Sequence, residues 1–242
     1  MEVKAYTIGR GKFLLKPAGQ NGYLDFGNIS SGKLSIKTEK KEHYSTRTGL
    51  KIKDAEIIIS QDFNIEIEVD ELRKEALEMY FLAVKTASKG AAASSTAVQD
   101  TIEQVKQGMW FPLTNRNIKR DPAPIVSDGT TTYREGVDYE IDYGAGLIYI
   151  VRNGNISDGT NLTVEYHHEA WNVEEYLAGG KYSIDGELYF VADPPKGQVL
   201  EIKGNVSLAP SGDFEVVSDE FLKVSFEGTF TEKPTLRLAE VR

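Results

Sequence analysis

The longest alternation of hydrophobic and polar residues in the chain lies between residues 33 and 69. In residues 54–69, isoleucine and phenylalanine alternate with acidic and other polar side chains, with Ile58 and Gln61 as exceptions, and residues 33–43 alternate more weakly. Because successive side chains of a strand point to opposite faces, this pattern predicts two strands, each with one apolar and one polar face. Both are longer than the usual five or six residues. We therefore expect a long hairpin whose strands are joined by a polar loop at 43–53.

A second pair of one-sided strands is expected toward the end of the chain. Residues 199–209 and 220–231 place large apolar residues at alternate positions and polar residues between them. The two pairs therefore predict sheets with one buried and one hydrated face. Shorter strands are expected at 3–8, 12–16, 181–191 and 235–239, the last at a sheet edge.

Between the two pairs the hydrophobic spacing becomes helical. Residues 71–84 carry a broad apolar stripe, which predicts a helix packed on the apolar face of a sheet. Asp70 is the expected N-cap, because its carboxylate can accept hydrogen bonds from the first free amides. Residues 86–96 are low in complexity and predict a mobile loop. Residues 171–178 predict a short helix or a turn.

Residues 116–168 read as a separate unit. They contain five short strand patterns separated by Asp-Gly and Gly-Ala-Gly turns. We expect a small β-sandwich domain inserted into a main β-domain made of residues 1–115 and 169–242. The predicted fold class is mainly β, with one flanking α-helix.

Charge is distributed unevenly over the 242 residues, whose net charge is −9. Residues 1–53 contain 11 Lys and Arg against 4 Asp and Glu, whereas residues 54–85 contain 3 against 9. Opposite charge on different parts of one surface suits head-to-tail self-association, although ordinary solvated faces give the same pattern. The acidic balance argues against a sequence-reading nucleic-acid binder.

The residues that carry chemistry are few. The chain has no cysteine and three histidines, of which His167 and His168 are adjacent and point to opposite faces of a strand. No nucleophile elbow or phosphate-binding loop is present. Asp138, Glu140 and Asp142 alternate along one strand face and lack the spacing of a calcium loop. We therefore expect no enzyme activity, no metal and no cofactor.

Targeting signals are also lacking in the sequence. No apolar run approaches the roughly 20 residues of a membrane span, and the first residues lack a signal-peptide core. We expect a protein made in a cytoplasm, without membrane insertion.

The order of these segments resembles the tail tube protein, or major tail protein, of long-tailed, siphovirus-like bacteriophages. The motifs that carry the resemblance are GNIS at 27–30, GVDY at 136–139 with GLIY at 146–149, and LAPSGD at 208–213 with SDEF at 218–221. Each motif alone is loose, and their order and spacing make the match more specific.

The resemblance implies a tail-tube β-sandwich or barrel that assembles into hexameric rings stacked as a helical tube. The tube would be part of the virion, made in the host cytoplasm, with tape-measure and tail terminator proteins as partners. Double-stranded DNA would pass through it without sequence-specific contacts during ejection into the host cell. The expected channel-lining residues are Glu56, Ser60, Asp62, Asn64, Glu66, Glu68, Glu201, Lys203, Asn205, Lys223, Ser225 and Glu227.

The hairpin loop and the N-terminal arm are the expected contacts between rings. The basic residues expected to make this contact lie in and beside the loop and are Lys40, Lys41, Arg47, Lys51 and Lys53. Two alternatives remain open. One is a non-viral tube, in a phage-like particle or a secretion system. The other is a carbohydrate-binding β-sandwich in which Tyr133, Tyr139, Tyr143 and Tyr149 would stack on sugars, unless they are cross-strand packing residues.

Overall fold

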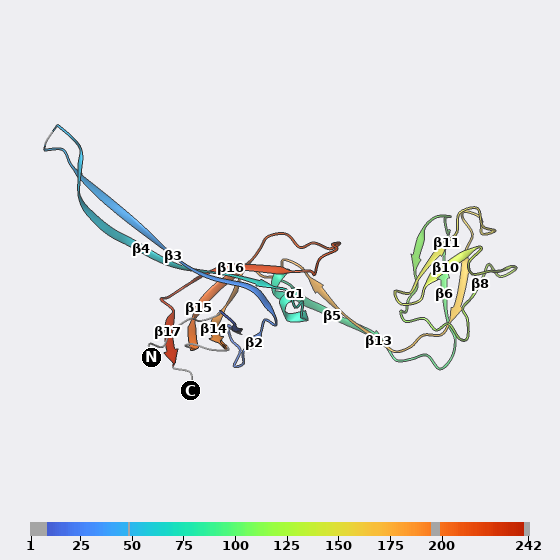
Figure 1. Ribbon diagram of the computed structural model, residues 1–242. Coiled ribbons are helices and arrows are strands. Elements are labelled where there is room, and N and C mark those ends of the chain that lie inside the picture. The colour runs from blue at the N-terminus through green and yellow to red at the C-terminus, as the bar shows by residue number, and fades with distance from the viewer. Residues whose placement is uncertain (1–8, 48, 195–198, 240–242) are drawn as a thin grey trace. The chain divides into compact units, whose positions relative to one another are not determined.

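The chain is mainly β, and a computed structural model describes residues 9–47, 49–194 and 199–239. The strand expected at 3–8 and the N-terminal arm lie outside the described residues. The chain divides into two compact units, the first made of residues 1–85 and 176–242 and the second of residues 86–175. The second unit therefore interrupts the first in the sequence (Figure 1).

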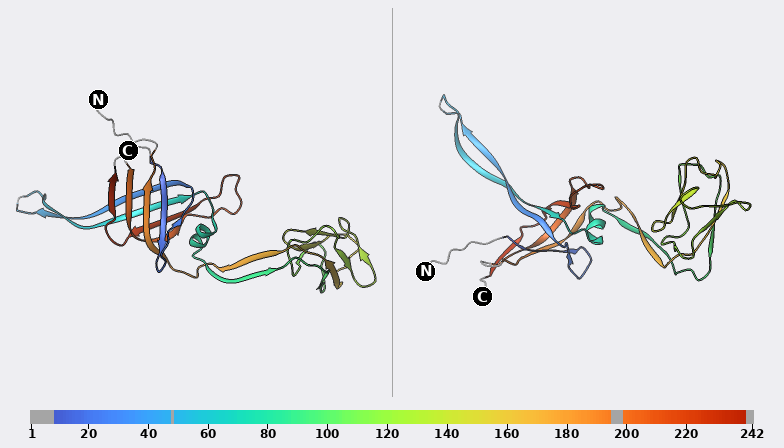
Figure 2. Two further views of the ribbon diagram at one scale, coloured as in Figure 1. Left: turned by 90° about the horizontal axis from the view of Figure 1, so that it is seen from below. Right: turned by 45° about the vertical axis from the view of Figure 1, so that its right-hand side comes forward.

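The first unit is built on one eight-stranded antiparallel sheet with the order β2-β1-β14-β15-β16-β4-β3, in which β17 also pairs with β15. Figure 2 shows this sheet from a second side. Its strands are β1 (Gly11–Pro17), β2 (Leu24–Asp25), β3 (Ile29–Ser45), β4 (Ile52–Val69), β14 (Ile184–Ala192), β15 (Val199–Ser211), β16 (Val224–Phe230) and β17 (Thr235–Ala239). Both expected strand pairs are present. The strands of the first pair, β3 and β4, are longer than the sequence predicts.

One face of this sheet forms the core of the first unit, as the alternation predicts. Opposed residues in the register, such as Ile67 and Phe226, are both buried on this face, and Ala76 of the helix packs against it. The buried strand residues are Phe13, Leu15, Ile65, Ile67, Val69, Ile184, Leu188, Val206, Leu208, Val224, Phe226 and Phe230. The residues between them face away from this core, so the sheet has one dry and one wet side.

The helix is shorter than expected and its predicted cap is wrong. Helix α1 spans Lys74–Tyr80, and its N-cap is Arg73, which makes no side-chain capping hydrogen bond. The Asp70 carboxylate instead accepts a hydrogen bond from Asn28 Nδ2 at 2.6 Å. Leu82 adopts the left-handed conformation (φ 47°), which ends the helical path before the next strand begins.

The segment expected as a mobile loop at 86–96 is largely a strand. Strand β5 (Val84–Ala91) pairs with β13 (Trp171–Leu177), the segment expected to be a short helix or turn. Lys89 forms an ion pair with Glu175 at 2.6 Å, and Thr86 Oγ1 donates a hydrogen bond to the Glu175 carbonyl. Small residues with weak intrinsic preference become a strand here because a distant segment supplies the hydrogen bonds.

The second unit contains two further sheets that enclose one hydrophobic core. One has the order β10-β11-β7 and the other β6-β12-β8-β9. The unit is wider than the expected 116–168, because β6 and β7 pair with β12 and β11 of that range. Its strands are β6 (Val98–Ile102), β7 (Trp110–Pro112), β8 (Ile125–Ser127), β9 (Thr132–Tyr133), β10 (Tyr139–Asp142), β11 (Leu147–Ile150) and β12 (Leu162–Tyr166).

Candidate interaction surface

The β3–β4 hairpin extends beyond the sheet of the first unit as a two-stranded arm. Strand β16 pairs with β4 only from Asn64 to Val69, so the earlier residues of β4 pair with β3 alone. We call residues 36–63 the arm (Figure 2). Apolar side chains along it lie in solvent, because no third strand or helix covers them in the described part of the chain. The most exposed are Ile36 at 58%, Leu50 at 75%, Ile52 at 55%, Ile57 at 68%, Ile58 at 55% and Ile59 at 57%.

Two β-bulges exchange the faces of the arm. Glu39 lies opposite Ser60 and the next residue, Lys40, lies opposite Ile58, which leaves Ile59 as the extra residue of the first bulge. Since the side-chain period is two, this extra residue moves the side chains of residues 55–58 to the other face. The second bulge, with Asp54 as its extra residue, moves Lys53 and Ile52 back. Glu56 therefore lies on the face opposite to Ser60, and its predicted place in the polar row of β4 is wrong.

On one face of the arm, lysines and glutamates of the arm form ion pairs with one another, and we call it the paired face. Lys40 Nζ lies 2.6 Å from a Glu56 carboxylate oxygen, and Lys53 Nζ lies 2.5 Å from Glu42 and also pairs with Glu56. Tyr44 donates a hydrogen bond to Glu42 at 2.5 Å. Hydrogen bonds from Lys40 and then Lys53 lower the pKa of Glu56 to about 2. Hydrogen bonds from Lys53 and then Tyr44 lower the pKa of Glu42.

The other face of the arm, which we call the apolar face, is different in character. Ile57 lies opposite Lys41 in the register, and Ile52 lies opposite Ser45. Lys41 makes no ion pair with any residue that the structure describes. This face therefore combines solvent-exposed isoleucines with a cation that has no carboxylate partner among the described residues.

The five basic residues expected to contact a neighbouring ring differ in whether they already have a partner within the arm. Lys40 and Lys53 are occupied on the paired face, and the Lys51 ammonium lies 4.8 Å from the centre of the Tyr44 ring. Lys41, Arg47 and Lys51 are the three of these residues for which the described part of the chain offers no ionic partner. The contact chemistry available to a neighbour thus comes from fewer charges than the sequence alone suggests.

The wet face of the sheet brings the other expected channel residues together across three strands. Opposed pairs such as Glu68 and Ser225, or Glu66 and Glu227, share this face. Lys223 precedes β16 and reaches Glu68 at 3.2 Å. The predicted residues on this face are Ser60, Asp62, Asn64, Glu66, Glu68, Glu201, Lys203, Asn205, Ser225 and Glu227.

This wet face is charge-balanced rather than acidic. Lys33 pairs with Glu66 at 3.3 Å and Lys203 pairs with Glu187 at 3.2 Å. The hydroxyl of Ser30 and then Lys223 lower the pKa of Glu68 through hydrogen bonds. Lysines from neighbouring strands therefore lie between the carboxylates that make β4 look acidic in the sequence.

A segment that sequence reasoning missed lies between β15 and β16. Its side chains Val216, Val217 and Phe221 are 78%, 94% and 90% exposed. The sequence prediction ended one strand at residue 209 and began the next at residue 220, and it assigned no element to Val216 and Val217. The available signal was two adjacent valines between acidic residues, which fits neither a half-buried strand nor a polar turn.

The remaining candidate chemistry is dispersed. His43 contacts Asp54 on the arm at 2.5 Å, whereas His168 is buried in the second unit. In the described residues, no three His, Cys, Asp or Glu side chains gather as a metal site would require.

Helix α1, the one helix in the described residues, is too short to cross a membrane. Tyr133 and Tyr139, considered as sugar-stacking residues, are buried in the core of the second unit.

The architecture defines a mainly β protein with an interrupted domain and a projecting strand arm. A family model described as "Protein of unknown function UCP028589" matches residues 6–238, and the chain belongs to that family. No curated protein matches the chain.

Proposed function

We propose that this chain is a structural virion subunit that assembles with copies of itself into stacked hexameric rings, which form a tail tube. The observation that carries the proposal is the arm, a projection of the β3–β4 hairpin at the edge of the sheet, with solvent-exposed isoleucines that lie mostly on β4. Such a projection favours aggregation of an isolated chain. Contact with another copy would bury the isoleucines and remove this hazard.

The sheet of the first unit fits the same role. It is open, with one dry face and one wet face, and copies placed edge to edge would extend it without exposing further apolar surface. In this arrangement the sheet would be one segment of a tail-tube β-barrel, and the second unit an inserted β-sandwich. The resemblance to tail tube proteins in the order of sequence motifs supports the proposal.

The wet face would line the channel for double-stranded DNA. DNA binds proteins mainly through phosphates and cations, so a lining with unpaired lysines would hold it. Here Lys33, Lys203 and Lys223 each lie beside a carboxylate. A charge-balanced wall of this kind would let DNA slide without strong attraction or repulsion.

Under this proposal the chain is not an enzyme and uses no cofactor. Its partners are other copies of itself, a tape-measure protein inside the tube and a terminator protein at its end. It would be made in the host cytoplasm and act in the virion. A tube in a phage-like particle or a secretion system would use the same surfaces.

Electron microscopy of the purified protein, at rising concentration and salt, tests the proposal. We expect hollow rings or tubes from the wild type and from Ile125→Asp, a matched control on an isoleucine that is 50% exposed in the second unit. Ile57→Asp should remain folded by circular dichroism and form no tubes. A wild type that never assembles, or an Ile57→Asp variant that assembles as well as the control, would contradict the proposal.

A second candidate function rests on the second unit. Trp110 is 51% exposed, and its ring lies 5.1 Å from that of Tyr149. An exposed pair of aromatic rings can stack on a sugar, which keeps carbohydrate binding as an alternative. Binding of the isolated monomer on a glycan array, lost in Trp110→Ala, would support it.

A further inference from the structure

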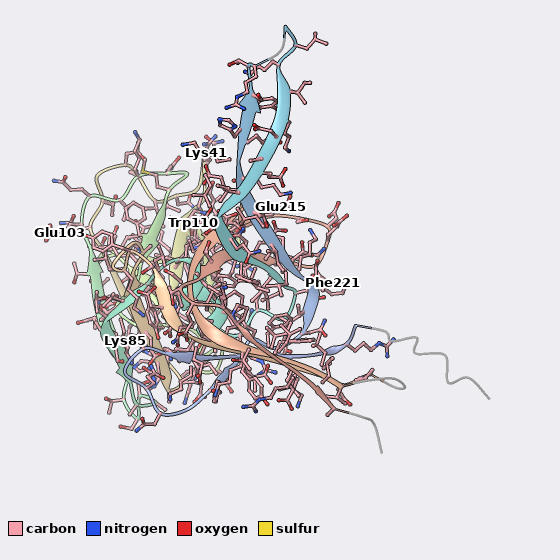
Figure 3. The ribbon with its side chains drawn as sticks, turned by 90° about the vertical axis from the view of Figure 1, so that its left-hand side faces the viewer. Lys41, Lys85, Glu103, Trp110, Glu215 and Phe221 are labelled. Carbon is pink, nitrogen blue, oxygen red and sulfur yellow. The ribbon has the colours of Figure 1, made fainter. Side chains whose placement is uncertain are left out.

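The segment between β15 and β16 is an acidic loop with apolar side chains at its surface. We call residues 212–222 the acidic loop. Asp213, Glu215, Asp219 and Glu220 lie in it and no lysine or arginine does. None of these four carboxylates makes an ion pair with a residue that the structure describes. Figure 3 labels Glu215 and Phe221 on this loop and Lys41 on the arm.

The base of the acidic loop is anchored while its tip is not. Phe214 packs against the rings of Tyr80 and Phe81 at 5.7 and 5.4 Å, and the Tyr80 hydroxyl donates a hydrogen bond to the Gly212 carbonyl at 2.9 Å. Val216 and Val217 follow directly and lie in solvent. The loop is therefore held on the first unit in a way that presents its apolar side chains outward.

A hollow adjoins the end of the acidic loop that leads into β16. It has a volume of about 550 Å³ and is lined by Asp70, Asp219, Glu220, Phe221 and Lys223. Lys223 is directed to Glu68, at 3.2 Å. The hollow thus offers three carboxylates and an aromatic ring to an incoming group, which suits a cation next to an apolar side chain.

The apolar face of the arm has the complementary chemistry. It presents Ile52 and Ile57 beside Lys41, while the paired face uses its lysines within the arm. Isoleucines meeting valines and phenylalanine would bury apolar area on both sides. A cation facing unpaired carboxylates would add specificity for this partner over others.

The two surfaces lie at opposite ends of one strand. The acidic loop ends where β16 begins, and Val224 lies opposite Val69 at the end of β4. Ile52 is the first residue of β4, and the strand has 18 residues, which at about 3.3 Å per residue separates its ends by roughly 55 Å. A chain cannot place its own arm on its own loop across that distance, so an arm docked on this loop would come from a second copy.

We propose that the apolar face of the arm of one copy docks on the acidic loop of a second copy. The contact is heterologous, because each copy gives its arm to one neighbour and its loop to another, and it repeats without closing on itself. This inference rests on the proposed function and deepens it, because it names the surface that accepts the arm. In a tube, the contact would stack one ring on the next.

Cross-linking tests this contact directly, because the chain contains no cysteine. Ile57→Cys and Val217→Cys are purified separately, mixed under assembly conditions and treated with a short bismaleimide. We expect a cross-linked dimer from this mixture. The matched control replaces Val217→Cys with Tyr182→Cys, at a residue that is 99% exposed outside the loop, and should give only background.

Electron microscopy of the same samples separates this inference from the proposed function. Tubes without the 57–217 cross-link would overturn the arm-to-loop contact and leave the tube proposal standing. The cross-link without rings or tubes would support the contact and overturn the tube. Neither tubes nor cross-link would overturn both.

A charge exchange gives an independent measurement. Lys41→Glu should raise the concentration needed for association about fivefold, since one exposed ion pair contributes up to about 1 kcal/mol. Lys41→Glu mixed with an Asp219→Lys/Glu220→Lys variant should recover part of this loss. Equal association of Lys41→Glu with the wild-type loop and with the reversed loop would overturn the charge pairing.

Discussion

The two ends of strand β4 have similar sequences and opposite environments. Ile65 and Ile67 are 4% and 1% exposed in the core, whereas Ile57 and Ile59, on the same strand, are more than half exposed. The difference lies in what surrounds them. The end with Ile65 and Ile67 pairs with β16 and is covered by the core, whereas the end with Ile57 and Ile59 pairs with β3 alone. Apolar alternation therefore indicates surface that has to be buried, and the tertiary structure decides whether the chain itself or a partner buries it.

Truncating one isoleucine at each end should give the largest contrast. Ile67→Ala removes buried methyl groups and leaves a cavity, so we expect a loss of about 3 kcal/mol in the free energy of unfolding. Ile57→Ala removes exposed groups and should change it by less than about 0.5 kcal/mol. Thermal or urea unfolding measures both. Comparable losses in the two variants would mean that the arm is packed within the monomer.

The ion pairs of the arm should produce a smaller effect, visible in pKa values rather than in global stability. Lys53→Met removes the cation between Glu42 and Glu56, so the pKa values of both carboxyls should rise toward their usual range. Nuclear magnetic resonance titration of the two side chains measures this. Lys41→Met, on the apolar face, is the control and should leave the pKa of Glu56 at about 2.

The sign of the pH dependence follows from these lowered pKa values. A carboxyl whose pKa is lower in the folded state stabilises that state above its usual pKa, and the contribution is lost as the pH falls through the lowered value. The pairs of Glu56 with Lys40 and Lys53 should therefore persist at pH 4 and weaken as the pH approaches about 2, the pKa of Glu56. Arm amides that lose hydrogen-exchange protection already between pH 6 and 5 would contradict this.

Deleting the bulge residue Ile59 should have the smallest effect. The deletion places Ile58 directly before Ser60, and these two residues already lie opposite the adjacent residues Lys40 and Glu39. The pair between Lys40 and Glu56 should then survive, with the lowered pKa of Glu56 unchanged. A return of that pKa to the ordinary range would show that the arm depends on the bulge for its register.

Hydrophobic patterning predicted the mainly β fold, the long hairpin and the dry face of the large sheet, because a period of two is a local property of the sequence. It failed where partners are distant. Residues 86–91 and 171–177 were predicted as loop and as helix or turn, and each is a strand because of the other. The helix ended early because Leu82 turns the chain toward β5, which no local propensity reports.

The candidate site shows the same limit in individual residues. Glu56 belongs to the polar row by simple counting, and only the register shift at Ile59 moves it to the face of Lys40. The row of carboxylates in β4 appears acidic by itself, until Lys33 and Lys223 arrive from other segments. The exposed valines of the acidic loop carried a local signal that alternation alone does not interpret.

The sequence by itself determined which residues have an apolar and a polar side, since side-chain alternation needs no knowledge of neighbours. It also determined the excess of basic residues near the hairpin and of acidic residues elsewhere. Only the tertiary structure decided which isoleucines are covered, which charges are paired, and that the arm and the acidic loop lie at opposite ends of β4. These depend on strand pairing between residues far apart in the chain, and pairing is settled by packing rather than by local pattern.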